Sequence, residues 1–171
     1  MGARVLGRDP SLAAEGMQRI QWVEKFMPVL NALRKEMKGS SVLKGKTVVM
    51  SIHLEAKTAY LALTLQAAGA RVIATGSNPL STQDPIAAGL DSQGICVYAT
   101  HGCTDQEYTD YLNHALDHHP DLIIDDGGIW SACFTQRVRK RETVFWEDQR
   151  KQPPASSACV TWKRREPSVF P

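Results

Sequence analysis

The run "KTVVMSI" (Lys46–Ile52) followed by "EAKTAYLALTLQAAG" (Glu55–Gly69) decides the fold class of this chain. The first run is short and rich in β-branched residues, which favours a buried strand. The second is rich in Ala and Leu and closes on a glycine, which is typical of a helix and its end. A strand that leads directly into a helix is the repeating unit of α/β proteins.

The same alternation continues along the chain to residue 126. Strands that are apolar throughout, alternating with helices, indicate a parallel sheet with helices on both faces. We therefore predict an α/β fold, an incomplete doubly wound, Rossmann-like parallel sheet. The further predicted elements are "RVIATG" (71–76), a helix at 82–90, "ICVYAT" (95–100), a helix at 105–117 and "DLIIDD" (121–126).

A single amphipathic helix is predicted ahead of this body, from Ser11 to about Lys38. Its apolar residues recur at steps of three and four, which marks one helix face, and Gly39 ends it. The residues on that face are Met17, Ile20, Val23, Phe26, Met27, Leu30, Leu33 and Met37.

The charge of the chain is unevenly distributed. Residues 1–128 hold 11 Lys and Arg against 14 Asp and Glu, a net of −3, whereas residues 129–171 hold 9 against 4, a net of +5. Basic tails can bind nucleic acid, but a solvated, unstructured extension is the more common outcome. The tail also lacks any sustained helical or strand period, so no core is expected there.

Composition limits the location and the metal chemistry of the protein. No run of some eighteen apolar residues is present, and the first residues lack a secretory signal, so we expect a cytoplasmic protein with no membrane partner. Cys96, Cys103, Cys133 and Cys159 show no zinc-type spacing and are expected as reduced thiols. His114 and His118 could chelate a metal from one helix, but a wet helix face is favoured, and no metal site is predicted.

Candidate binding residues follow the predicted strands, because open α/β sheets bind ligands beyond the carboxyl ends of their strands. These positions are 52–55, 76–84 and 125–128. The loop "SNPLSTQD" (77–84) is also explained as a turn with Ser81 or Thr82 capping the next helix. Neither G-x-G-x-x-G nor G-x-x-x-x-G-K-[ST] occurs, so no dinucleotide or triphosphate cradle is predicted in this chain.

Residues 10–128 resemble the N-terminal part of the S-adenosylhomocysteine hydrolase family. The resemblance is carried, in order and spacing, by "MPVLNALRKEM", "LKG", "H-x-x-x-x-TA", "GSNPLSTQD", "G-x-x-VYA" and "IIDDGG". It implies a Rossmann-like substrate-binding domain, followed in the intact family by a separate NAD-binding domain, in a homotetramer.

The resemblance also implies a reaction and roles for particular residues. In the family, NAD oxidises the ribose 3′-hydroxyl of S-adenosylhomocysteine, homocysteine is eliminated, water adds and the hydride returns, so acid–base groups flank the ribose. By motif, Asp126 matches the catalytic aspartate and His53 a catalytic histidine near the 5′ leaving group. Thr58 and Gln83 match nucleoside-binding positions. Singly, each also has an ordinary structural explanation.

The first motif departs from the common family pattern. Many members have a threonine and a glutamate or glutamine where this sequence has Glu55 and Lys57, so it resembles a branch with "HLEAKTA". These two residues are candidate substrate-binding positions, and the purine contact need not match the common one. An ammonium at residue 57 suggests a purine with a 6-carbonyl, as in S-inosylhomocysteine; a solvated lysine is the alternative.

The tail resembles the family in another reading frame. The family continues with segments close to "LLHTE" and "EETTTG", which are absent here, yet the codons of residues 146–156 permit "GGSEETTTGV" after a shift of one base. We therefore predict a single-base deletion near the codon of Gly128, genomic or from sequencing, with 129–171 as an out-of-frame, largely disordered tail.

The sequence thus predicts a fragment of an enzyme that hydrolyses S-adenosyl-L-homocysteine, or S-inosyl-L-homocysteine, with residues 1–128 as part of the substrate-binding domain. The chain alone is expected to be inactive and to bind no NAD. One alternative is a free-standing purine-nucleoside binding or regulatory module. Another is a nucleic-acid binder using residues 137–141 and 163–165, which is disfavoured because the interleaved aromatics form no stacking platform.

Overall fold

The computed structural model describes residues 9–126 and the short segment 144–147. Between residues 47 and 125 strands and helices alternate, as predicted. The helices are η1 (Pro10–Leu12), α1 (Ala13–Glu24), α2 (Pro28–Met37), α3 (Ala56–Ala67), α4 (Asp84–Ser92) and α5 (Asp105–Leu116), and the strands are β1 (Thr47–Ser51), β2 (Arg71–Thr75), β3 (Cys96–Tyr98), β4 (Leu122–Asp125) and β5 (Val144–Glu147).

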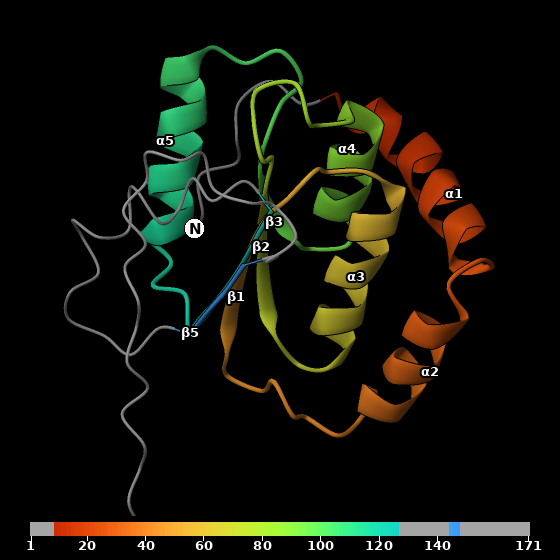
Figure 1. The fold of residues 1–171 in the computed structure, drawn as a ribbon. Helices are drawn as coiled ribbons and strands as arrows, with labels where there is room; N and C mark the ends of the chain where they lie inside the picture. Colours follow the sequence, from red (N-terminus) through yellow and green to blue (C-terminus); the bar gives the residue numbers. More distant parts are fainter. Residues whose placement is uncertain (1–8, 127–143, 148–171) are drawn as a thin grey trace, which may run out of the picture.

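The strands form one parallel sheet in the order β3-β2-β1-β4-β5. β1 lies between β2 and β4, with Val49 opposite Ile73 on one side and Ile123 on the other. Helices α1 to α4 lie on one side of the sheet and α5 on the other (Figure 1). The predicted α/β class, with a parallel sheet covered on both faces, is confirmed.

Successive strand residues supply two separate layers of core, because side chains alternate across a strand. On one face, Val48, Met50 and Val72 are buried against the helices of the α1 to α4 layer. On the other face, Val49 and Ile123 pack with residues of α5. Burial on both faces explains why these strands are apolar throughout rather than alternating.

The prediction of one helix from Ser11 to Lys38 is wrong, because the structure has two helices, α1 and α2, in this stretch. α2 begins at Pro28, whose nitrogen cannot donate a helical hydrogen bond and whose ring restricts the residue before it. Met27 accordingly has φ −120° and ψ 62°, outside the helical region. None of the helices in the described ranges is both long and apolar enough to cross a membrane.

Strand β5 was not predicted, since no regular element was expected after Gly128. Its backbone pairs in parallel with β4, with Val144 opposite Leu122 and Glu147 opposite Asp125. The rest of residues 127–171 lies outside the described part of the chain. The division into a domain at 1–128 and an out-of-frame tail therefore stays a prediction.

Candidate functional site

The loops that follow β1, β2 and β4 meet at the carboxyl end of the sheet. The strand order places β1 and β4 side by side although three helices and two strands separate them in sequence. This is where the chain reverses its winding direction, the position at which doubly wound sheets bind ligands. The predicted residues His53 and Asp126 each stand just beyond one of these two strands.

His53 and Asp126 are in direct contact. Nδ1 of His53 lies 2.9 Å from Oδ2 of Asp126, and the backbone N–H of His53 donates to the same oxygen at 3.3 Å. Ser77, from the loop after β2, places its Oγ 2.9 Å from the same Nδ1. Because a carboxylate only accepts hydrogen bonds, Nδ1 is the nitrogen that carries the proton here, which leaves Nε2 for a ligand.

The side chain of Thr58 holds the turn between β1 and α3. Its hydroxyl accepts from the N–H of Glu55 at 3.0 Å and lies 2.6 Å from the carbonyl oxygen of His53, to which it donates. This arrangement satisfies an amide at the beginning of α3 and fixes the backbone that carries His53. Thr58 is therefore more than the plain surface position that its helix would suggest.

The two residues that depart from the common family motif form an ion pair. Nζ of Lys57 lies 3.4 Å from Oε1 of Glu55, with side chains 66% and 39% exposed. Because both groups are largely in water, this pair contributes little to stability. Its charges remain available to a ligand at the mouth of the turn.

The "SNPLSTQD" loop is organised by Ser81, but not as a helix cap. Oγ of Ser81 accepts from the N–H groups of Ser77 and Asn78 at 2.9 and 3.0 Å. The N-cap of α4 is Gln83, whose side chain makes no capping bond, so the alternative explanation of Ser81 or Thr82 as the cap is wrong. The turn needs Gly76, since a Cβ there would lie 2.8 Å from Oγ1 of Thr82.

An isolated parallel bridge between Leu54 and Thr82 joins the two loops. The N–H of Leu54 donates to the carbonyl of Ser81 at 2.9 Å, and the N–H of Gln83 donates to the carbonyl of Leu54 at 3.0 Å. The backbone pairing therefore continues past the ends of β1 and β2. It holds Gln83 beside the turn that carries His53.

An open pocket of about 570 Å³ lies over these loops. Three of the six predicted site residues, His53, Glu55 and Gln83, line it, whereas Lys57, Thr58 and Asp126 do not. The remaining lining residues are Arg19, Leu80, Ser81, Thr82, Asp84, Pro85 and His101.

Sequence reasoning missed Ser77 as a partner of His53, and it missed Arg19 and His101 as pocket residues. His101 is held by two bonds: its N–H donates to Oδ1 of Asp84 at 2.8 Å, and Nδ1 donates to the carbonyl of Thr82 at 3.0 Å. It follows the third strand, so the rule that selected the other loops would have found it. Arg19 carries no such signal, because it belongs to a helix that is distant in sequence.

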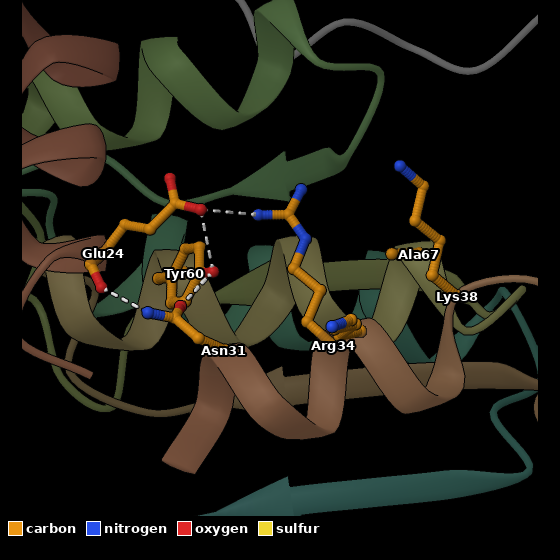
Figure 2. A pocket seen from close by; sticks show the side chains of 7 residues that line it. Glu24, Asn31, Arg34, Lys38, Tyr60 and Ala67 are labelled. Atoms are coloured by element: carbon orange, nitrogen blue, oxygen red, sulfur yellow. Dashed lines mark hydrogen bonds and ion pairs between the residues drawn. The ribbon is translucent and has the colours of Figure 1, made fainter. Parts of the chain in front are cut away.

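A second pocket of about 500 Å³ lies where α1, α2 and α3 meet, and it contains none of the predicted site residues (Figure 2). The hydroxyl of Tyr60 lies 2.6 Å from Oδ1 of Asn31 and 3.0 Å from Oε1 of Glu24, while the guanidinium of Arg34 sits over the tyrosine ring. The amide of Asn31 also donates to the carbonyl of Glu24 at 2.8 Å. These contacts join the three helices, so we assign this cluster a structural role.

Another histidine cluster lies at the opposite end of the sheet. The guanidinium of Arg71, at the start of β2, lies 2.9 Å from Nδ1 of His118, and the hydroxyl of Tyr98 lies 2.9 Å from Nε2. Burial, followed by the charge of Arg71, lowers the pKa of His118, and burial raises the pKa of Tyr98 to about 12. α5 ends at Leu116, so His118 is not on the same helix as His114, contrary to the prediction.

No group of three His, Cys, Asp or Glu in the described ranges is arranged to hold a metal ion. Cys96 and Cys103 are free thiols, and Cys133 and Cys159 lie outside the described residues.

The described sheet does not fit a dinucleotide at the turn where such folds bind one. That turn, between β1 and α3, must let a pyrophosphate approach the helix N-terminus, and it usually does so with glycines. Here it holds His53, Leu54 and Glu55 in place of glycines, and Glu55 adds a carboxylate at the start of the helix. This end of the sheet is therefore suited to a nucleoside contacted by side chains rather than to NAD.

The fold and the site together define a Rossmann-like α/β domain with a histidine–carboxylate pair at its topological switch point. The family model described as S-adenosyl-L-homocysteine hydrolase matches residues 5–167. The chain belongs to this family. The matched range extends past Gly128, but it does not by itself assign the residues there to a reading frame.

Curated relatives carry two different names. The chain is 51% identical to the adenosylhomocysteinase of Pyrococcus abyssi over 139 residues, which cover 81% of this chain and 33% of that protein. It is 52% identical to the S-inosyl-L-homocysteine hydrolase of Methanocaldococcus jannaschii over 120 residues, which cover 70% and 29%. The adenosylhomocysteinase of Thermotoga maritima is 54% identical over 113 residues, covering 66% and 28%. The chain thus spans about a third of the length of the curated relatives that it matches.

Proposed function

We propose that this chain supplies the nucleoside-binding and proton-transfer part of an enzyme that hydrolyses S-adenosyl- or S-inosyl-L-homocysteine to a nucleoside and L-homocysteine. The observation that carries the proposal is the 2.9 Å contact between His53 and Asp126 at the switch point of the sheet. His53 also lines the pocket that contains Glu55 and Gln83. The names of the relatives support the substrate class.

His53 is proposed to handle the proton at the 5′ carbon where the thioether breaks. Asp126 accepts from Nδ1 and so orients the ring, which leaves Nε2 to take or give a proton on the pocket side. Ser77 contacts the same Nδ1 and helps to fix the ring plane. A histidine oriented by a carboxylate is a common arrangement for general acid–base catalysis.

Glu55 and Lys57 are proposed to select the purine. A carboxylate accepts from the 6-amino group of adenine, and an ammonium donates to the 6-carbonyl of hypoxanthine. The two side chains are paired at 3.4 Å, so a base that engages one charge must compete with the other. We propose that Lys57 makes the inosyl substrate acceptable or preferred; relatives of both names match this chain about equally well, so their names do not decide the question.

NAD, which the family resemblance implies, is proposed to be held outside the described residues. The turn between β1 and α3 does not suit it. A homotetramer and a cytoplasmic location are proposed on the same resemblance.

The test compares two forms of the protein. The 171-residue chain is expressed as it stands, and a second form is expressed from coding DNA with one base restored after the codon of Gly127 and read through the downstream region. We expect hydrolysis of adenosyl- or inosylhomocysteine, in the presence of NAD, only from the restored form. Turnover by the short chain, or coding DNA in which no frame encodes "EETTTG", would contradict the proposal that residues 129–171 are out of frame. An inactive restored form would contradict the proposed function.

A further inference from the structure

Helix α1 lies in backbone contact with the first turns of α4, and glycines make this contact possible. A Cβ on Gly16 would lie 1.8 Å from the carbonyl oxygen of Pro85, and a Cβ on Gly89 would lie 3.2 Å from the backbone of Gly16. No side chain fits between the two helices at these points. α1 therefore has one position along α4, and that position determines which of its side chains reach the pocket.

Arg19, one turn after Gly16, reaches the pocket from this helix. Its guanidinium is paired with Glu15 on the same helix, and Nη1 lies 3.4 Å from Oε1 of Gln83. Gln83 is the residue just before α4, where the α1 contact falls. Both side chains line the pocket that contains His53.

The chemistry of the contact determines the orientation of the Gln83 amide. A guanidinium has only donors, so the atom that faces it must be the carbonyl oxygen of the carboxamide. The NH2 group of Gln83 is then the part available to a ligand. Without Arg19, the carboxamide could turn by 180° and present its oxygen instead.

We propose that Arg19 is a positioning residue that makes Gln83 a hydrogen-bond donor to the purine of the substrate. The proposal rests on the proposed function, since it takes the pocket to bind a nucleoside. Adenine and hypoxanthine both offer ring nitrogens that accept hydrogen bonds. Arg19 should therefore affect binding of both bases, unlike Lys57, which should affect the choice between them.

The experiment uses the restored enzyme and the variants Arg19→Ala, Arg19→Lys, Gln83→Ala and the double variant Arg19→Ala with Gln83→Ala. We expect Arg19→Ala to raise KM roughly fivefold, the effect of about one hydrogen bond, with kcat within about twofold. Lysine, like arginine, offers only hydrogen-bond donors, so Arg19→Lys should have a KM close to that of the unmodified enzyme. The double variant should be no worse than Gln83→Ala, because Arg19 acts through Gln83.

Arg34→Ala is the matched control. Arg34 is also a helical arginine paired with a glutamate, Glu24, at 3.8 Å, but it lines the other pocket (Figure 2). The KM of the Arg34→Ala variant should equal that of the unmodified enzyme. Additive effects of Arg19→Ala and Gln83→Ala, or an equal rise in KM from Arg34→Ala, would overturn the role of Arg19. An unchanged KM in Gln83→Ala, or an inactive restored enzyme, would overturn the proposed site itself and this inference with it.

Discussion

The two ends of the sheet each hold a histidine between a charged group and a hydroxyl, and the charged groups have opposite signs. At the carboxyl end, His53 faces the carboxylate of Asp126 and the hydroxyl of Ser77. At the amino end, His118 faces the guanidinium of Arg71 and the hydroxyl of Tyr98. The first ring donates from Nδ1, whereas the second must accept there, because Arg71 has only donors.

The two histidines also differ in their exposure and in what their ring nitrogens contact. His53 is exposed, with 55% of its side chain accessible, and its Nε2 is left for a ligand in the pocket. His118 is half-buried, its two nitrogens are occupied by protein groups, and its pKa is lowered. We therefore expect catalysis at the first histidine and structural support from the second, which the following changes test.

The largest effect is expected at the carboxyl end. In the restored enzyme, His53→Ala and Asp126→Asn should each lower kcat/KM by roughly 10²- to 10⁴-fold, because each removes part of a general acid–base pair. The control is His118→Gln, which keeps a polar side chain at the amino end and should leave kcat/KM within about twofold. Steady-state kinetics check both values. Equal losses at the two ends would remove the distinction between the histidines.

A smaller effect is expected on stability at the glycine contact that supports the carboxyl end. Gly16→Ala should lower the free energy of unfolding by about 2–3 kcal/mol, since the new methyl group would overlap the carbonyl of Pro85 and the helices must separate. Gly89→Ala is the graded comparison, because its nearest contact is 3.2 Å rather than 1.8 Å, and it should cost less. Urea unfolding of the restored protein measures both. A larger loss of unfolding free energy in Gly89→Ala than in Gly16→Ala would show that α1 does not pack on α4 in this way.

The purine preference should change by about tenfold, the effect of exchanging one donor for an acceptor near the base. In the restored enzyme, Lys57→Glu should raise the ratio of adenosyl to inosyl kcat/KM, because a carboxylate accepts from an amino group and repels a carbonyl. Lys44→Glu, on the loop before β1, makes the same charge change away from Glu55 and the turn that carries His53, and it should leave the ratio unchanged. A constant ratio in Lys57→Glu would make Lys57 a solvated surface residue.

The smallest effect is expected from titration at the amino end. The pKa of His118 is lowered from its usual 6.5 in the folded protein, so as pH falls below 6.5 the unfolded chain binds the proton first. The stabilising contribution of the neutral ring is complete above pH 6.5 and is lost as pH falls through the folded pKa. Arg71, His114 and His119 oppose the charged ring, while Asp117 favours it.

The measurement for this titration is urea unfolding between pH 7.5 and 5. His118→Gln should make the free energy of unfolding depend less on pH over this interval, and His119→Gln, on the exposed neighbour, should change the dependence less. If the free energy of unfolding depends on pH equally in both variants and in the unmodified protein, the contact between Arg71 and His118 has no energetic role.

Much of the site could be predicted from the sequence, because its main residues directly follow strands. His53, Glu55 and Asp126 were identified in this way and by motif, and the structure places His53 and Asp126 in contact. Their catalytic and binding roles stay predictions. The loop after β3 obeys the same rule, so His101 could also have been predicted. The end of the first helix before Pro28 could have been predicted from the proline alone.

The sequence by itself determined the α/β class, the order of the helices and strands from β1 to β4, and the family to which the chain belongs. These depend on local apolar patterns and on motifs of neighbouring residues. Only the tertiary structure decided that Ser77 contacts His53, that Arg19 reaches Gln83 and that Arg71 meets His118. Each of these contacts joins segments distant in sequence, and its existence depends on strand order and helix packing, such as the backbone contact at Gly16, which no local pattern encodes.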